Sequence, residues 1–186
     1  MTLVVGLGNP TKKYENNRHN IGFKLIDVLI DEFRATNITK ASLKGELYKS
    51  KDTLFLKPLT FMNLSGESVN LVVKYYKIQR VIVIHDDIDL KLGVIKLKHG
   101  GGHGGHNGLR SIDQYIGKDY DRVRIGVGKP ENKEDVAHYV LSDFAKEESE
   151  CVAKVINHVA KIVHELILHD INHVANKYIT KQGICP

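Results

Sequence analysis

Residues 81–89 read Val81-Ile82-Val83-Ile84-His85-Asp86-Asp87-Ile88-Asp89. The first four residues form a continuous apolar run, which is typical of a central strand covered on both faces. The run ends abruptly in a histidine followed by two aspartates. Because ligands bind beyond the carboxyl ends of the strands in open α/β sheets, these polar residues lie where a site is expected.

Strands and helices alternate along the chain on both sides of this run. Apolar runs predict strands at residues 3–5, 43–51, 53–57, 81–84, 94–98 and 122–127, with residues 43–57 forming a hairpin that ends at Pro58. Helical spacing predicts helices at residues 21–33, 65–76 with Ser65 as the cap, 109–116, and 145–178 with a break near Asp170. The alternation predicts a single α/β domain over residues 1–186, with a twisted, mixed, largely parallel sheet covered by helices on both faces.

Composition places the chain among ordinary globular proteins, with 42% hydrophobic and 26% charged residues. No apolar run approaches the length of a membrane span, and the first residues lack the features of a signal peptide, so we expect a cytoplasmic protein without a membrane. Cys151 and Cys185 are far from any CxxC spacing. We expect two free thiols, as in a reducing compartment.

The formal charge is +5, from 27 lysines and arginines against 22 acidic residues. The excess is concentrated between Lys91 and Lys133, in Lys96, Lys98, Arg110, Arg122, Arg124 and Lys129. This concentration favours a polyanionic partner. The alternative is a basic surface that is merely solvated.

A glycine-rich turn, Lys98-His99-Gly100-Gly101-Gly102-His103-Gly104-Gly105-His106-Asn107-Gly108, connects a predicted strand to a predicted helix. Such a turn can direct unpaired backbone N–H groups and the positive end of the helix dipole at an anion, and phosphate is the natural candidate. A flexible linker is one alternative. A metal site is another, since His99, His103 and His106 have ligand-like spacing, but the run offers no cysteine or carboxylate and would be poorly preorganised.

Three distant segments are expected to meet at the carboxyl edge of the sheet, and they carry Asn9, His19 and Asp86. A histidine can take a proton from water at neutral pH, and a carboxylate on its other nitrogen orients the ring and stabilises the imidazolium. No GxSxG motif is present and neither cysteine has a suitable setting, so the sequence favours direct attack by activated water. Alternatively, His19 is a structural residue at a helix start, and Asn9, Asn63 and Asn107 are ordinary turn residues.

Several motifs resemble those of bacterial peptidyl-tRNA hydrolases, in the family's order and over nearly the whole chain. They are Gly6-Leu7-Gly8-Asn9-Pro10, Tyr14 with Arg18-His19-Asn20-Ile21-Gly22, Phe61-Met62-Asn63-Leu64-Ser65-Gly66, His85-Asp86-Asp87-Ile88-Asp89-Leu90, Gly100 to Gly108, and Arg124-Ile125-Gly126-Val127-Gly128.

The resemblance implies hydrolysis of the ester between a peptide and the 3′ ribose of tRNA, which recycles tRNA, by a monomer needing neither metal nor cofactor. By matching motif positions, His19 would be the base, Asp86 its stabiliser, and Asn9 the residue that senses the blocked amino group. The acceptor end would be lined by Tyr14, Phe61, Asn63 and Asn107, with Lys98 and Arg124 near tRNA phosphate. Two residues depart from the family pattern: Asn17 replaces a threonine, and His99 replaces a small or apolar residue.

Two other functions stay open from the sequence. A metal-dependent hydrolase using the histidines of the glycine-rich turn would lose activity on chelation. A non-enzymatic RNA-binding module would tolerate replacement of His19, and fold alone does not separate these possibilities.

Overall fold

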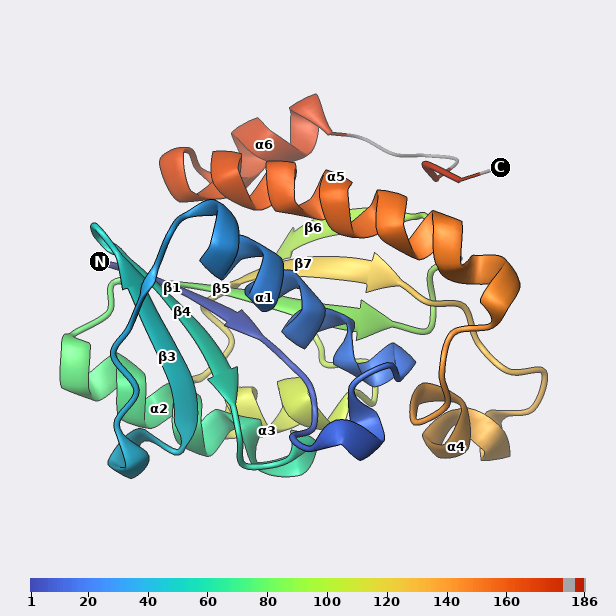
Figure 1. The fold of residues 1–186 in the computed structure, drawn as a ribbon, viewed down its shortest axis with the longest axis horizontal. Helices are drawn as coiled ribbons and strands as arrows, with labels where there is room; N and C mark the ends of the chain where they lie inside the picture. Colours follow the sequence, from blue (N-terminus) through green and yellow to red (C-terminus); the bar gives the residue numbers. More distant parts are fainter. Residues whose placement is uncertain (179–182, 186) are drawn as a thin grey trace.

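In the computed structural model, which describes residues 1–178 and 183–185, seven strands form one sheet in the order β2-β3-β4-β1-β5-β7-β6 (Figure 1). The strands are β1 (Thr2–Gly6), β2 (Thr36–Asn37), β3 (Gly45–Ser50), β4 (Thr53–Pro58), β5 (Arg80–Asp87), β6 (Ile95–His99) and β7 (Asp121–Gly126). The central strands β4, β1, β5 and β7 are parallel, whereas β2–β3, β3–β4 and β6–β7 are antiparallel pairs. The predicted mixed sheet with a parallel centre is confirmed.

Helices cover both faces of the sheet (Figure 1). On one face lie α1 (Ile21–Glu32), α5 (Ser149–Leu168) and α6 (Ile171–Lys177), and on the other lie α2 (Ser65–Tyr76) and α3 (Asn107–Ile116). Strand β5 serves both layers, because successive side chains point to opposite faces. Ile82 and Ile84 pack with α1 and α5, while Val81 and Val83 pack with α2 and α3. This is why the run at 81–84 is apolar without alternation.

Most predicted elements form within a few residues of their expected bounds, including the hairpin that ends at Pro58. The break in the C-terminal helix is also confirmed, since the Asp170 side chain caps α6 by accepting from the N–H of His173 at 3.0 Å. The predicted cap at Ser65 is wrong. Ser65 is already helical, and its hydroxyl donates to the carbonyl of Met62 at 2.8 Å. The short helix α4 (Val136–Val140) was not predicted.

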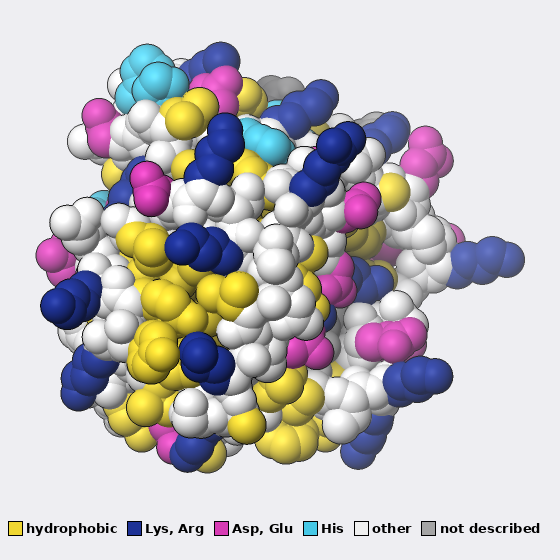
Figure 2. Space-filling model, turned by 60° about the vertical axis from the view of Figure 1, so that its left-hand side comes forward, with side chains coloured by type: hydrophobic (Ala, Val, Ile, Leu, Met, Phe, Trp, Pro, Cys, Tyr) yellow, Lys and Arg dark blue, Asp and Glu magenta, His cyan; other side chains and the backbone are white. Residues whose placement is uncertain are grey.

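The surface mixes basic and apolar side chains. Figure 2 shows a face on which hydrophobic side chains lie among lysines and arginines. Large side chains such as Tyr75 of α2 and Tyr115 of α3 are exposed, which is ordinary for a globular surface. No helix in the described part of the chain combines the length and hydrophobicity that crossing a bilayer requires.

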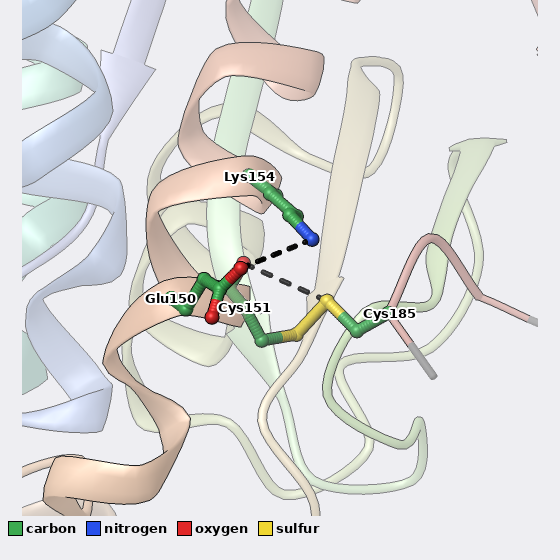
Figure 3. Close-up of a disulfide and its surroundings, with 4 residues drawn as sticks. All are labelled: Glu150, Cys151, Lys154 and Cys185. Atoms are coloured by element: carbon green, nitrogen blue, oxygen red, sulfur yellow. Dashed lines mark hydrogen bonds and ion pairs between the residues drawn. A yellow bond between two sulfur atoms is a disulfide. The ribbon is translucent and has the colours of Figure 1, made fainter.

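The two cysteines form a disulfide between the first turn of α5 and the end of the chain (Figure 3). Their Cα atoms are 5.6 Å apart, and the adjacent N–H of Ile184 donates to the carbonyl of Gly93 at 2.9 Å. The expectation of free thiols is therefore wrong, because the fold returns the chain end to α5 across 34 residues of sequence. Free thiols therefore no longer support the prediction of a reducing compartment.

Reduction of the Cys151–Cys185 bond should lower the free energy of unfolding by about 2 to 4 kcal/mol, because the bond restricts the unfolded chain. Urea unfolding with and without dithiothreitol measures this difference. The Cys151→Ser variant is the matched control, since its stability should already be lowered and should not respond to the reductant. Equal stability of the oxidised and reduced parent would contradict the prediction.

His85 should make the protein less stable as the pH falls. The side chain is buried, its Nδ1–H donates to the Asp86 carbonyl at 2.8 Å, and Nε2 has no partner among the described residues. Burial, reinforced by repulsion from His106, lowers the pKa of His85 from 6.5 to about 3. Below pH 6.5, the ordinary pKa of histidine, the unfolded chain therefore binds more protons at this residue than the folded protein does. The free energy of unfolding decreases as the pH is lowered through that range.

Between pH 6.5 and 5.5 this group should remove about 1 kcal/mol from the free energy of unfolding. The measurement is urea unfolding of the parent and of His85→Leu at both pH values. The variant should lose less stability than the parent by that amount. Parallel losses in the two proteins would show that His85 does not titrate on unfolding.

Candidate active site

The site lies at the carboxyl end of β5, where the turn before α1 and the start of α3 also meet. Gly22 permits this approach. A Cβ at that position would lie 2.5 Å from the Leu7 nitrogen and 2.6 Å from the Ile84 carbonyl oxygen. Only glycine therefore lets the first turn of α1 rest on the ends of β1 and β5. His19, in the 3-10 turn Arg18–Asn20 just before α1, is thereby brought to Asp86.

Asp86 is held by two imidazoles. His19 Nδ1 lies 2.9 Å from both carboxylate oxygens, and His106 Nε2 lies 2.9 Å from Oδ1. The carboxylate is 2% exposed. Burial would raise the pKa of Asp86, but electrostatic attraction to His19 and His106 and the hydrogen bonds from both rings outweigh it and hold the pKa well below its ordinary value. Asp86 is therefore an acceptor for both rings.

Hydrogen bonding fixes the tautomer of each ring. His106 Nδ1 accepts from the backbone N–H groups of Gly108 at 3.1 Å and Leu109 at 3.3 Å, so its proton is on Nε2 and faces Asp86. His19 likewise directs Nδ1–H at the carboxylate. This leaves the lone pair of His19 on Nε2, to which no described residue bonds. His19 can therefore accept a proton from a group in the adjoining cleft.

The cleft has a volume of about 720 Å³. Its walls are the end of β5, the glycine-rich turn, β7 and α4. Both His19 and Asp86 line it, which places the predicted base at a space large enough for a substrate group.

His106 is a site residue that the sequence did not single out for this role. The sequence indicates it only as a possible metal ligand and predicts that α3 starts at Leu109, whereas the helix starts at Asn107. As the residue before α3, His106 occupies two of the N–H groups that were expected to face phosphate. Its position immediately before Asn107-Gly108, at a helix start, was the available signal.

The three-histidine metal site is not formed. His99 is bonded to Asp121 and Asp119 at 2.7 and 2.8 Å, and these hydrogen bonds raise its pKa. A different set, His19, Asp86 and His106, places ligand-type atoms within 4.8 Å of one another. In the tautomers described above, both rings direct N–H groups at the carboxylate, so a cation there would have to displace those protons.

The side-chain oxygen of Asn9 is already hydrogen-bonded within the protein. Its Oδ1 accepts from the N–H of Met62 at 2.7 Å, and its backbone exchanges two hydrogen bonds with the Asn20 side chain at 2.9 Å. Because only an oxygen can accept from Met62, the Nδ2 amide must point the other way. Asn9 therefore offers a substrate a donor and not an acceptor. It lines a second hollow, of about 370 Å³, together with Asn20.

The remaining predicted acceptor-end residues lie on three segments: Tyr14 on one, Phe61 and Asn63 on another, and Asn107 at the start of α3. Phe61 is 49% exposed and meets Tyr14 edge to face at 6.4 Å. It precedes Met62, the partner of Asn9, and the exposed Asn63 follows. Asn107 is exposed directly after His106. Asn63 and Asn107 therefore adjoin residues that already contact Asn9 and Asp86, respectively.

The basic residues of the cleft are partly paired. Lys98 is exposed on its wall, whereas Arg124 donates through Nε to Asp87 at 2.8 Å. Arg122, which the sequence assigned only to the basic excess, is buried on the same wall and donates to the Gly102 carbonyl at 3.1 Å. The spacing of two between Arg122 and Arg124, which puts them on one face of a strand, was a signal for both.

Comparisons of the sequence and of the fold with known proteins lead to one family. The family model described as peptidyl-tRNA hydrolase matches residues 3–184. The peptidyl-tRNA hydrolase of a Sulfurovum species is 56% identical over 183 residues, covering 97% of each chain, and that of Campylobacter curvus is 53% identical over 184 residues, covering 99% of each. The crystal structure of the Acinetobacter baumannii peptidyl-tRNA hydrolase is similar, with a TM-score of 0.90 and 37% identity over 95% of this chain and 93% of that one. The chain belongs to the peptidyl-tRNA hydrolase family.

Proposed function

We propose that the protein hydrolyses the ester bond of peptidyl-tRNA, releasing peptide and free tRNA, with His19 as the base that activates water. The observation that carries the mechanism is the His19–Asp86 pair, which leaves His19 Nε2 at the cleft without a bond to any residue that the structure describes. The activity recycles tRNA from prematurely released peptidyl-tRNA.

The chemical steps use one proton acceptor that later becomes a donor. His19 Nε2 takes a proton from water as the water oxygen attacks the ester carbonyl carbon. Asp86 stabilises the resulting imidazolium through Nδ1–H, and it remains ionised itself. When the bond from the carbonyl carbon to the ribose oxygen breaks, Nε2 returns the proton to that oxygen. The products are a peptide with a free carboxyl group and a tRNA with a free 3′ hydroxyl.

The other residues bind the two ends of the substrate. Asn9 donates Nδ2–H to the carbonyl oxygen of the amide that blocks the amino group, and Tyr14, Phe61, Asn63 and Asn107 contact the acceptor end. Lys98 and Arg124 meet tRNA phosphate, with Arg122 beside them on the cleft wall. A monomeric state and a cytoplasmic location stay predictions.

Replacement His19→Ala should lower turnover by about 10² to 10⁴, because a positioned base typically contributes this much. Binding of tRNA should persist, and Asp86→Asn should lose less activity. The assay is cleavage of N-acetylaminoacyl-tRNA, with circular dichroism to verify folding.

The same assay with EDTA separates the rival functions. Activity of the parent should be unchanged by the chelator. A loss on chelation that added zinc restores would favour a hydrolase using metal at His19, Asp86 and His106. Retention of more than half the activity in His19→Ala would exclude His19 as the base.

Asn9→Asp should narrow the preference for blocked over unblocked aminoacyl-tRNA. The new Oδ1 still accepts from Met62, while the Nδ2 donor becomes a charged acceptor. That acceptor can balance an ammonium, which a neutral amide cannot, but it cannot donate to the amide of the blocked substrate. The ratio of the two kcat/KM values measures the effect, with Asn16→Asp, which adds a charge on a nearby exposed turn, as the control. An unchanged ratio in Asn9→Asp would assign the discrimination to another residue.

A further inference from the structure

Arg18 precedes the proposed base and is buried, with 8% of its surface exposed. We propose that Arg18 is a positioning residue that locks the turn carrying His19 onto the segment between α4 and α5. The inference rests on the proposed function of His19, because it concerns how that base is held.

The backbone on either side of Arg18 is paired with this segment. The N–H of Arg18 donates to the carbonyl of Ser142 at 3.1 Å. Asn17 forms an isolated β-bridge with Asp143, and its Nδ2 donates to the Asp143 carboxylate at 2.7 Å. The side chain of Asn17 is therefore bonded to the same junction as its backbone.

The Arg18 side chain folds over the segment that its backbone contacts. Nη1 donates to the Ser142 hydroxyl at 2.7 Å and to the Asp143 carbonyl at 2.8 Å, and Nη2 pairs with Glu148 at 3.1 Å. The guanidinium also stacks over the ring of Tyr139, 4.2 Å from its centroid. A planar group with several fixed donors is required for this arrangement, and the single ammonium of lysine cannot reproduce it.

The segment is itself fixed to the sheet and to the cleft. The Tyr139 hydroxyl donates to the carbonyl of Val127, just past β7, at 2.7 Å. Val136, Ala137 and Val140 of α4 line the cleft. Arg18 thus sets the distance between the His19 turn and one wall of the cleft.

His19 therefore has two independent anchors. Asp86 on β5 orients its ring and sets its tautomer, whereas Arg18 fixes the backbone from which the ring projects. Loss of Arg18 leaves the His19–Asp86 hydrogen bonds in place but removes the restraint on where Nε2 lies relative to substrate. A displacement of this kind lowers the rate of the chemical step more than it weakens binding of a large substrate held elsewhere.

The test compares Arg18→Met and Arg18→Lys with a control arginine. Arg80 pairs with Asp121 at 2.8 Å and is at the amino end of β5, away from the site, so Arg80→Met reports the cost of removing an ion-paired arginine. Steady-state kinetics on N-acetylaminoacyl-tRNA give kcat, KM and the pH dependence of kcat. Guanidinium ion is then added at low millimolar concentration, with urea as the neutral control.

We expect kcat of Arg18→Met to fall about 10- to 100-fold with KM changed less than about threefold. The midpoint of the pH profile should stay that of the parent, guanidinium but not urea should restore part of kcat, and Arg18→Lys should recover only part. Arg80→Met should keep the parental kcat.

The inference is overturned if Arg18→Met or Arg18→Lys has the parental kcat, or if kcat of Arg80→Met falls as far as that of Arg18→Met. It is also overturned if Arg18→Met changes KM instead of kcat. A shifted pH midpoint would likewise overturn it, since Arg18 would then act on the protonation of His19. If Arg18→Met does not fold, Arg18→Lys is tested in its place and judged by the same criteria. An inactive parent enzyme would instead refute the proposed function.

Discussion

The buried carboxylate of Asp86, shared by His19 and His106, is the interaction on which the site depends. An ionised carboxylate that is 2% exposed is costly to remove from water unless it is well hydrogen-bonded. Both imidazoles therefore have to present N–H groups to it. Because His106 Nδ1 also accepts from the first amides of α3, the carboxylate joins β5, α3 and the turn before α1. One charge thus fixes the tautomers of two rings and the relative positions of three segments.

The fold supplies the conditions under which this carboxylate can be buried. Strand β5 lies inside the sheet between β1 and β7, and its apolar residues pack into both helical layers. Because β5 is packed on both faces, its register is fixed. The register in turn determines the side of the sheet toward which Asp86 points. The close approach at Gly22 then brings the His19 turn over the end of the strand. Core packing and active-site geometry are therefore set by the same elements.

The sequence predicted the layers, the parallel centre and the convergence of His19 with Asp86, because these depend on local periodicity and on the rule for strand ends. It did not predict the disulfide, since Cys151 and Cys185 approach only through the path of α5, α6 and the chain end. The role of His106 depends on a contact with Asp86 across 20 residues. The orientation of Asn9 depends on Met62, 53 residues away. Such pairings between residues far apart in the chain leave no periodic signal in the sequence.

The pairing of Arg124 with Asp87 is compatible with the phosphate contact proposed for this arginine. The pair uses only Nε, at 2.8 Å, and no described residue bonds to the two terminal nitrogens. A guanidinium held at one edge presents its other edge in a fixed direction, so less side-chain entropy is lost when an anion binds. Asp87 does lower the net charge of the cleft wall, which weakens long-range attraction. Arg122, anchored through Gly102 and without a carboxylate partner among the described residues, offsets this loss. Acidic and basic side chains are equally numerous in the lining of the cleft, so the oriented donors of Arg122 and Arg124, rather than an overall positive charge, would hold a phosphate there.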